Sequence, residues 1–308
     1  MLRSSSSRLL SGGLLAALLL GLIALIPPAA HGAPAPNEAP AGANDWSCRP
    51  GEAHPRPVVL VHGTWADMAT TWKSLSPALK EQGYCVFALN YGTSDPQTGQ
   101  NLLDLVGGNS IERSAATLAE FVSKVKSATG AGQVDIVGHS QGALVSRQYL
   151  KFNGGTNTAN PARNQVNTLV SLAGTNHGTT FNFNQEIGAI AQLLGVPVVK
   201  LAATTVGPSY VQQMVGSHFL TKLNAGGDTM PSVDYVAIGT KNDLMVTPPE
   251  RTFLKAGPGA TVQNVWVQDG CSAAVVDHGA VTSSPRSVWL TLNALDPAYG
   301  AAHEAPCP

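Results

Sequence analysis

Apolar residues occur along this chain in short continuous runs, separated by longer stretches with apolar residues at helical spacing. The run Val58–Val61 contains no polar residue, as expected of a strand buried on both faces of a sheet. Five further apolar-rich runs predict strands at Cys85–Leu89, Val134–Val137, Val166–Leu172, Val233–Ile238 and Val262–Val267. Strands that alternate with helical segments indicate an α/β fold, with a mostly parallel sheet flanked by helices.

The stretches between these strands predict the helices that cover the sheet. Helical spacing of apolar residues is found at Thr71–Gln82, Ile111–Val125, Gly142–Leu150 and Ser284–Leu295. Gly83 follows the first of them, and glycine commonly ends a helix. Asn109 and Glu112 have the spacing of a capping box at the start of the second.

The segment from Val134 to Gly142 combines a strand, a Gly-x-Ser-x-Gly motif and the start of a helix. Ser140 is at the centre of the motif, where the chain has to reverse sharply from strand to helix. Gly138 and Gly142 lack side chains that would clash with the neighbouring strand and helix. The pattern predicts Ser140 as the nucleophile of an acyl-transfer site, and a capping serine in an ordinary turn is the alternative.

Such a site needs two backbone N–H donors for the oxyanion of its tetrahedral intermediate. The residue after the nucleophile, Gln141, is expected to supply one donor. The loop His62-Gly63-Thr64 follows an earlier strand, and we expect Thr64 to supply the other donor. His62 itself is expected to hold this loop in shape.

The general base should follow the nucleophile and the acid in chain order Ser, Asp, His. His278 lies after the predicted strand Val262–Val267 and before the last helix, so it is the predicted base. His177 is the competitor, although it lies too early in the chain for this order.

The acid is expected on a loop that follows a late strand. Asp243 comes shortly after Val233–Ile238, where a carboxylate can orient the imidazole and stabilise its cation. Asp269 and Asp277 lie after the next strand and are the alternatives.

About sixty residues separate two of the predicted strands, and a connection of that length is uncommon unless it is functional. This insert, residues 174–231, contains candidate helices at Ile187–Leu194 and Tyr210–Leu223. One face of the first helix carries Ile187, Ile190, Ala191 and Leu194, and we expect this face to be buried.

Two interpretations of the insert remain open. The apolar face packs permanently on the sheet, or it belongs to a cap over Ser140 whose apolar side lines an acyl pocket. We favour the cap because the insert is uncharged between Glu186 and Lys200. Whether the cap moves as a lid is left open.

The N-terminal residues 1–32 have the pattern of a signal peptide. Arg3 and Arg8 precede a long apolar run that ends in small residues, as at a cleavage site. An uncleaved membrane anchor is the alternative, because the apolar run is about 18 residues long. Residues 33–45 are expected to form a flexible leader, and residues 46–308 the catalytic domain.

The four cysteines lie outside any Cys-x-x-Cys pair, which argues against zinc or thioredoxin-like chemistry. Of the three possible connectivities, we favour Cys48–Cys85 with Cys271–Cys307, since both loops are then local. Disulfides together with a signal peptide predict a secreted protein with no membrane span after cleavage.

Net charge argues against a nucleic-acid-binding protein, and residue spacing argues against a metal-dependent hydrolase. The 18 basic and 19 acidic residues give a formal net charge of −1, unlike the basic surface that nucleic-acid binding requires. No cluster of His, Asp and Glu has metal-ligand spacing, so a metal-dependent hydrolase is disfavoured. A structural calcium ion is left open.

Taken together, these motifs resemble the secreted, actinomycete-type bacterial lipases and esterases of the α/β-hydrolase superfamily. The matching segments are Pro57–Thr64, Gly138–Gly142, Gly239–Pro248 and Val276–Gly279. The resemblance implies an α/β-hydrolase fold and ester hydrolysis on acylglycerols through an acyl-enzyme, with no cofactor. The expected partner is a lipid or ester substrate at a lipid–water interface, and the expected state is a monomer. A carboxylesterase or acyltransferase using the same triad, and a non-catalytic binding module, are the alternatives.

Overall fold

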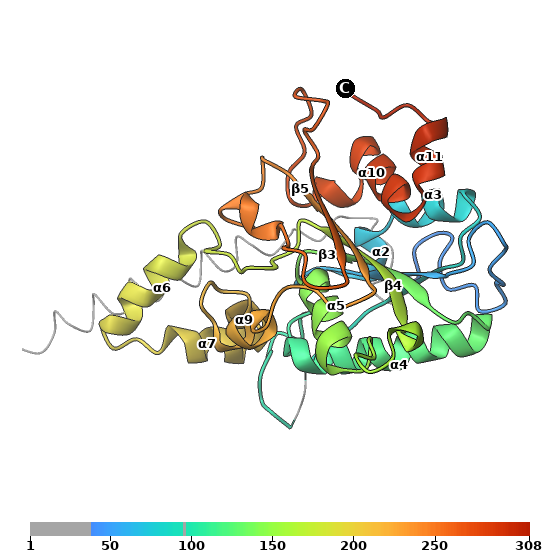
Figure 1. The fold of residues 1–308 in the computed structure, drawn as a ribbon. Coiled ribbons are helices and arrows are strands. Elements are labelled where there is room, and N and C mark those ends of the chain that lie inside the picture. The colour runs from blue at the N-terminus through green and yellow to red at the C-terminus, as the bar shows by residue number, and fades with distance from the viewer. Residues whose placement is uncertain (1–37, 95–96) are drawn as a thin grey trace, which may run out of the picture.

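The computed structural model describes residues 38–94 and 97–308, and a β-sheet forms its centre (Figure 1). Within these residues six strands lie in the order β2-β1-β3-β4-β5-β6, and every neighbouring pair is parallel. Their bounds are β1 Val58–Val61, β2 Val86–Leu89, β3 Val134–His139, β4 Val166–Leu172, β5 Asp234–Gly239 and β6 Thr261–Trp266. The predicted parallel sheet is confirmed.

Strand β1 shows why its sequence has to be apolar throughout. Successive side chains of a strand point to opposite faces of the sheet. Val59 and Val61 accordingly join the core on one face, and Val58 and Leu60 join the core on the other. All four side chains are fully buried, so a polar residue at any of these positions would face a hydrophobic core.

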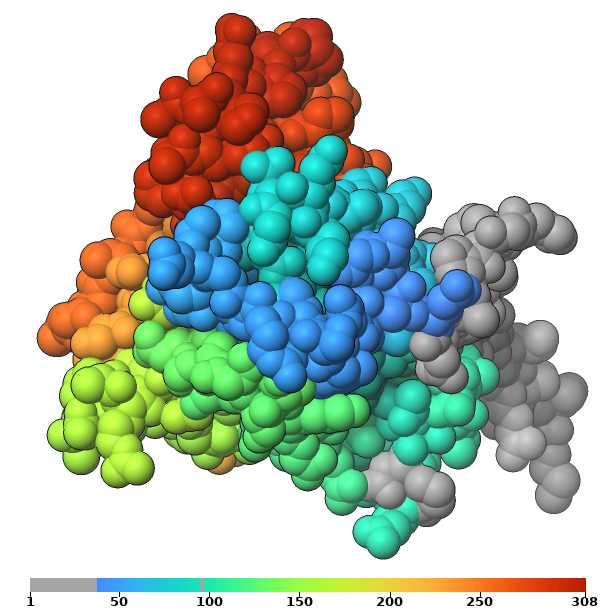
Figure 2. Space-filling model, turned by 90° about the vertical axis from the view of Figure 1, so that its right-hand side faces the viewer, coloured from blue at the N-terminus to red at the C-terminus, as the bar shows by residue number. Residues whose placement is uncertain are grey.

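Helices cover both faces of the sheet (Figure 1). The first face is covered by α2 Met68–Thr71, α3 Leu75–Glu81 and α10 Pro285–Leu295. The second face is covered by α4 Ile111–Thr129, α5 Gln141–Phe152 and α9 His218–Asn224. Figure 2 shows the C-terminal segment in red, including α11 Pro297–Ala302, above the α2–α3 region in cyan. Short 3-10 turns occupy Pro161–Arg163, Pro249–Thr252 and Ala280–Thr282.

The helix predicted at Thr71–Gln82 is in fact two short helices, α2 and α3, separated at residues 72–74. Pro77 explains the break, because its ring lacks an N–H group and clashes with the carbonyl of the residue four positions earlier. Proline is tolerated in the first turn of a new helix, which is where α3 places it. The predicted end of the helix at Gly83 is confirmed. Helix α3 ends just before this glycine, whose φ of +87° lies in the left-handed region.

The N-cap of α4 is Ser110, and the capping box predicted with Asn109 is wrong. The Ser110 side chain accepts a hydrogen bond from the N–H of Arg113. Glu112 does not reach back to the start of the helix, because its carboxylate accepts a hydrogen bond of 2.6 Å from Gln212 of the insert.

The insert after β4 forms four helices: α6 Asn184–Leu193, α7 Val198–Thr205, α8 Pro208–Gln212 and α9. The single helix predicted at Tyr210–Leu223 is wrong, because Gly216 turns the chain with a φ of +77°. Ser217 then caps α9 by accepting a hydrogen bond from the N–H of Leu220. Helix α7 has no counterpart among the predicted elements.

The expectation that the apolar face of α6 is buried is also wrong. Ala191 is buried, but Ile187, Ile190 and Leu194 are 49%, 58% and 70% exposed. Helix α6 packs mainly against α7 and lies at the edge of the molecule, away from the sheet (Figure 1). Permanent packing of this face on the sheet is therefore contradicted.

The start of the chain differs from the sequence-based expectation in one respect. The predicted signal peptide, residues 1–32, and residues 33–37 of the predicted leader lie outside the described residues. Residues 41–45, which also belong to the predicted leader, lie along β2. The side chain of Asn44 both donates to the Ala88 carbonyl and accepts from the Ala88 N–H, each at 2.9 Å. Asn44 thereby pairs with the outer edge of the sheet.

Both predicted disulfides are confirmed. Cys48–Cys85 ties the N-terminal segment to the residue before β2. Cys271–Cys307 ties the C-terminal tail to the loop that follows β6 and leads to His278. Among the described residues no cysteine is free.

Candidate functional site

Ser140 occupies a sharp turn between β3 and α5, with φ 53° and ψ −119°. A Cβ atom on Gly142 would lie 2.1 Å from the Val61 carbonyl oxygen, and one on Gly138 would lie 2.7 Å from the Gly142 backbone. Both glycines are therefore required by the close approach of backbone segments. The Ser140 side chain makes no capping hydrogen bond to α5, which argues against its being an ordinary helix cap.

His278 and Asp243 form the pair that the motif order anticipates. The Nδ1 atom of His278 lies 2.8 Å from Oδ2 of Asp243. The other carboxylate oxygen, Oδ1, accepts hydrogen bonds of 2.8 Å from the N–H groups of Met245 and Val246. Asp243 is buried and held by these two hydrogen bonds, so it fixes the imidazole through Nδ1, with the Nε2 atom on the opposite side of the ring from this contact.

His139 fastens the loop that carries His278 beside the Ser140 turn. The two rings lie 4.9 Å apart, and Nε2 of His139 is 2.9 Å from the backbone oxygen of His278. Burial, followed by the nearby His278, lowers the pKa of His139 to about 3, so this ring is neutral and donates its Nε2 proton to the carbonyl. No role was predicted for His139 from the sequence, although its position next to Ser140 was a usable signal.

The loop after β1 lies directly against Ser140. A Cβ atom on Gly63 would be 3.1 Å from the Cβ of Ser140. Thr64 follows, and its hydroxyl donates to Oε1 of Gln141 at 2.6 Å, which joins the two predicted oxyanion residues. Gln141 is the first residue of α5, where backbone N–H groups have no partner inside the helix.

His62 has the loop-holding position expected of it. Its ring is fully buried, stacks on Tyr91 with centroids 4.2 Å apart, and contacts the Gly63 carbonyl through Nδ1 at 2.8 Å. Burial lowers the pKa of His62 to about 4, so the ring is neutral near pH 7.

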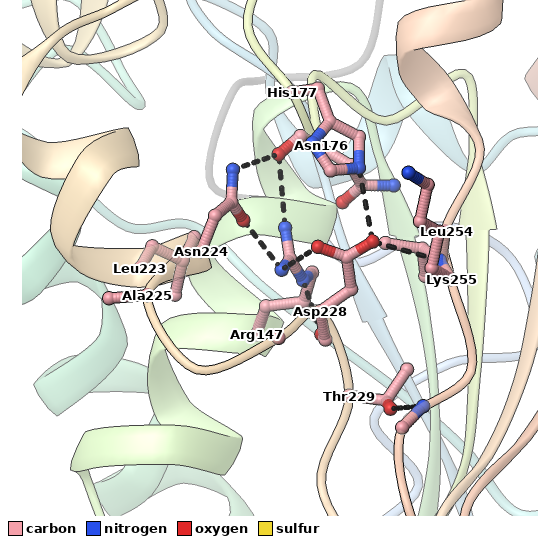
Figure 3. Close-up of polar contacts among 12 residues, drawn as sticks. Arg147, Asn176, His177, Leu223, Asn224, Ala225, Asp228, Thr229, Leu254 and Lys255 are labelled. Carbon is pink, nitrogen blue, oxygen red and sulfur yellow. Dashed lines mark hydrogen bonds and ion pairs between the residues drawn. The ribbon is translucent and has the colours of Figure 1, made fainter.

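The competing residues have other partners. His177 points to Asp228, with its Nε2 atom 3.1 Å from Oδ2 (Figure 3). Asp277 accepts a hydrogen bond from the N–H of Ala280, and Asp269 accepts one from the N–H of Trp266. Of the candidate acids, Asp243 is the one that contacts His278.

The insert contains an apolar cavity of about 760 Å³ between α6, α7 and α8. Its lining includes Leu193, Val198, Leu201, Val206, Tyr210 and Met214. Tyr210 stacks on Trp65, with ring centroids 5.5 Å apart, and Trp65 is the neighbour of Thr64. The cavity thus lies behind an aromatic wall that borders the loop of the predicted oxyanion hole.

Two features of the described residues concern the expected partners. They contain no group of three or more His, Cys, Asp or Glu side chains placed to hold a metal ion. In the same residues, no helix has the length and apolar character that a membrane crossing requires.

Part of the chain is similar in sequence to known lipases. Triacylglycerol lipases of Pseudarthrobacter phenanthrenivorans and Burkholderia plantarii are each 33% identical over 96 residues, or 30% of this chain. The matched segments cover 27% and 24% of those proteins, so the chain spans about a quarter of the length of the curated relatives it matches.

Two solved lipases share the fold. Aspergillus fumigatus lipase B has a TM-score of 0.62 and 21% identity, over 88% of this chain and 57% of that chain. Mature Bacillus licheniformis lipase BlEst2 has a TM-score of 0.50 and 15% identity, over 85% of this chain and 96% of that chain. A model of the family described as Lipase (class 2) matches residues 55–279. Because this match covers most of the chain, the chain belongs to the class 2 lipase family.

Proposed function

We propose that the protein is a secreted serine hydrolase that cleaves carboxylic esters, with acylglycerols as its substrates. Ser140 is the nucleophile, His278 the general base and Asp243 the acid that orients it. The observation that carries the proposal is the 2.8 Å contact between His278 and Asp243, next to a serine held in a strained strand-to-helix turn. Membership of the class 2 lipase family supports the same chemistry.

In the proposed first step, Nε2 of His278 takes the proton of the Ser140 hydroxyl while Oγ attacks the ester carbonyl carbon. Asp243 stabilises the imidazolium that results. Collapse of the tetrahedral intermediate breaks the C–O bond, and the imidazolium gives its proton to the leaving alcohol. Water then attacks the acyl-enzyme by the same route and releases the carboxylic acid.

The backbone N–H groups of Thr64 and Gln141 are the proposed donors to the oxyanion. Gln141 is suited to this role because it begins α5, and the N-terminus of a helix favours negative charge. Removing one such donor in other enzymes lowers kcat by about 10²–10³.

We further propose that residues 174–231 form a cap whose apolar side receives the acyl chain. The 760 Å³ cavity is within the size range of ligand pockets, and apolar residues dominate its lining. Exposed apolar side chains on α6 and α7, among them Ile190 and Leu193, would contact lipid at an interface.

The cap proposal predicts a dependence on chain length. Leu193→Asp should impair hydrolysis of p-nitrophenyl palmitate more than hydrolysis of the acetate ester, because a carboxylate in the cavity wall opposes a long chain. Phe152→Asp is the matched control, since Phe152 is an exposed apolar residue at the end of α5, outside the insert. Equal loss on both esters for Leu193→Asp would contradict an acyl-binding cap.

The choice of base has its own test. His278→Ala should lower kcat by about 10⁵–10⁶, as expected when one member of a triad is removed. His177→Ala should keep activity within about tenfold of wild type, because His177 contacts Asp228 and not the proposed triad. The reverse ranking would show that the wrong histidine has been assigned.

Secretion and a monomeric state remain part of the proposal. The two disulfides support an oxidising compartment. The exported protein is expected to begin at Ala33 and to elute as a monomer. An intact Met1 on the mature protein would contradict the proposed signal peptide.

A further inference from the structure

Gln213 lies just after α8, in a part of the insert that is fastened to the body of the protein. Ser209 of α8 donates its N–H to the Gly108 carbonyl and its hydroxyl to the Gly107 carbonyl. The residue before Gln213, Gln212, accepts a hydrogen bond of 2.8 Å from the N–H of Ile111. The insert thereby caps the N-terminus of α4, and α8 is held in place from outside the active site.

The side chain of Gln213 points the other way, toward the side chains of the two proposed oxyanion-hole residues, and is 1% exposed. Its Nε2 atom donates to the hydroxyl oxygen of Thr64 at 2.8 Å and to Oε1 of Gln141 at 3.3 Å. Its Oε1 atom accepts from the hydroxyl of Thr175 at 3.0 Å. One amide group therefore contacts both residues whose N–H groups are the proposed oxyanion donors.

The orientation of this amide follows from its neighbours. Nε2 of Gln213 also faces the Ser209 carbonyl oxygen at 3.2 Å, and a carbonyl can only accept. Oε1 of Gln141 is likewise an acceptor, because the Nε2 atom of Gln141 already donates to the Gly107 carbonyl. A reversed Gln213 amide would bring three oxygens together, so the direction of the hydrogen bonds is determined.

We infer that Gln213 is a positioning residue for the oxyanion hole, supplied by the insert. The inference rests on the proposed serine-hydrolase function. Gln213 directs the Thr64 hydroxyl toward Gln141 and holds the two residues in register. Their N–H groups are then preorganised for the charge that develops in the transition state. The substrate's ground-state carbonyl gains little from this arrangement.

The same contacts divide the insert into two parts. Residues 207–217 must stay in place for the oxyanion hole to remain assembled. Motion of the cap that keeps these contacts is confined to α6 and α7, which make no hydrogen bond to Thr64 or Gln141 in the part of the chain that the structure describes. The C-terminal carbonyls of α7 are themselves held by the backbone N–H groups of residues 101–103. The insert is thus a component of the catalytic machinery as well as a cover.

The test compares Gln213→Leu with Gln148→Leu, a matched change at a buried glutamine near the C-terminal end of α5 that donates to the Asn153 side chain. Active sites are counted by phosphonate titration, so that misfolded protein does not affect kcat. For Gln213→Leu we expect kcat on p-nitrophenyl butyrate to fall about 10–100-fold, with KM within about twofold. The affinity for a phenylethyl boronic acid, which forms a tetrahedral serine adduct, should fall by a similar factor. Gln148→Leu should lower the thermal midpoint and change neither quantity.

Gln213→Glu gives a second measurement, the pH dependence of kcat, which would not change if Gln213 had only a structural role. Its carboxylate cannot donate to Thr64, and its charge opposes the oxyanion. The ratio of variant to wild-type kcat should therefore rise as the pH falls from 8 to 5 and the carboxylate becomes protonated. A Gln213→Leu kcat per titrated site within threefold of wild type, or a pH-independent ratio for Gln213→Glu, would overturn the inference.

The two proposals fail in different ways. If Ser140→Ala keeps its activity, the serine mechanism fails, and the role of Gln213 fails with it. If Ser140→Ala is inactive while Gln213→Leu is unaffected, only the role of Gln213 is refuted.

Discussion

Asp228, near the end of the insert, joins three parts of the molecule (Figure 3). Its Oδ1 atom lies 3.7 Å from the guanidinium of Arg147 on α5. Its Oδ2 atom contacts the His177 ring and accepts a hydrogen bond of 2.8 Å from the N–H of Lys255. Burial alone would raise the pKa of Asp228, but the hydrogen bonds from His177 and Lys255 and the charge of Arg147 hold it below its usual value.

We predict that Asp228→Asn lowers the free energy of unfolding by about 3–5 kcal/mol. Two unit charges 3.7 Å apart interact by about 4.5 kcal/mol at an effective dielectric constant of about 20. Arg147 is fully buried and would be left without a counter-charge, the situation in which breaking an ion pair costs most. Its hydrogen bonds to the Asn176 carbonyl and the Asn224 side chain remain and limit the loss.

Urea unfolding at pH 7, followed by tryptophan fluorescence, measures this loss. With an m-value of about 3 kcal/mol/M, the midpoint should fall by about 1–1.7 M. Asp234→Asn is the control, because that aspartate is exposed at the start of β5 and should change stability by less than about 0.5 kcal/mol. The double variant Arg147→Met with Asp228→Asn should be more stable than Asp228→Asn alone. A loss below about 1 kcal/mol for Asp228→Asn would refute the reasoning.

Three further predictions follow from the packing. Gly142→Ala should reduce activity to below about 1%, because its Cβ would lie 2.1 Å from the Val61 oxygen; a fully active variant would contradict this. Replacing Cys271 and Cys307 by Ser should lower stability by about 3–4 kcal/mol and reduce activity, whereas an unchanged thermal midpoint would argue against a structural bridge. Unfolding free energy should fall by on the order of 6 kcal/mol between pH 7 and pH 4, about half of it from each of two buried histidines. Burial lowers the pKa of His62 to about 4 and that of His139 to about 3, whereas a histidine of the unfolded chain binds a proton below about 6.5; a flat profile would count against it.

The features that were predicted well from the sequence are each determined by local structure. The run Val58–Val61 is apolar because both of its faces are buried, and that requirement is visible in four adjacent residues. Gly138 and Gly142 are glycines because backbone segments approach within the reach of a Cβ atom. The pairing of His278 with Asp243 was anticipated because chain order along a parallel sheet brings late loops to one edge.

The insert was predicted less well because its residues are determined by contacts with residues far away in the chain. Apolar spacing indicated a buried face on α6, whereas Ile190 and Leu194 are exposed there and the helix packs mainly against α7. Gln213 belongs to no motif, and its partner Thr64 is 149 residues away in the chain. Neither the periodicity of apolar residues nor a local motif can reveal a polar contact between residues so far apart in the sequence.

The measurement that tests the central claim most directly is covalent labelling of the nucleophile. A p-nitrophenyl phosphonate reacts with an activated serine and releases p-nitrophenol, leaving one phosphonyl group on the enzyme. We predict one equivalent of p-nitrophenol, a single modified peptide containing Ser140, and parallel loss of esterase activity. His278→Ala should react at least about 10³-fold more slowly, because the hydroxyl then lacks its base. Modification at another residue, or undiminished activity of enzyme fully labelled on Ser140, would contradict the account.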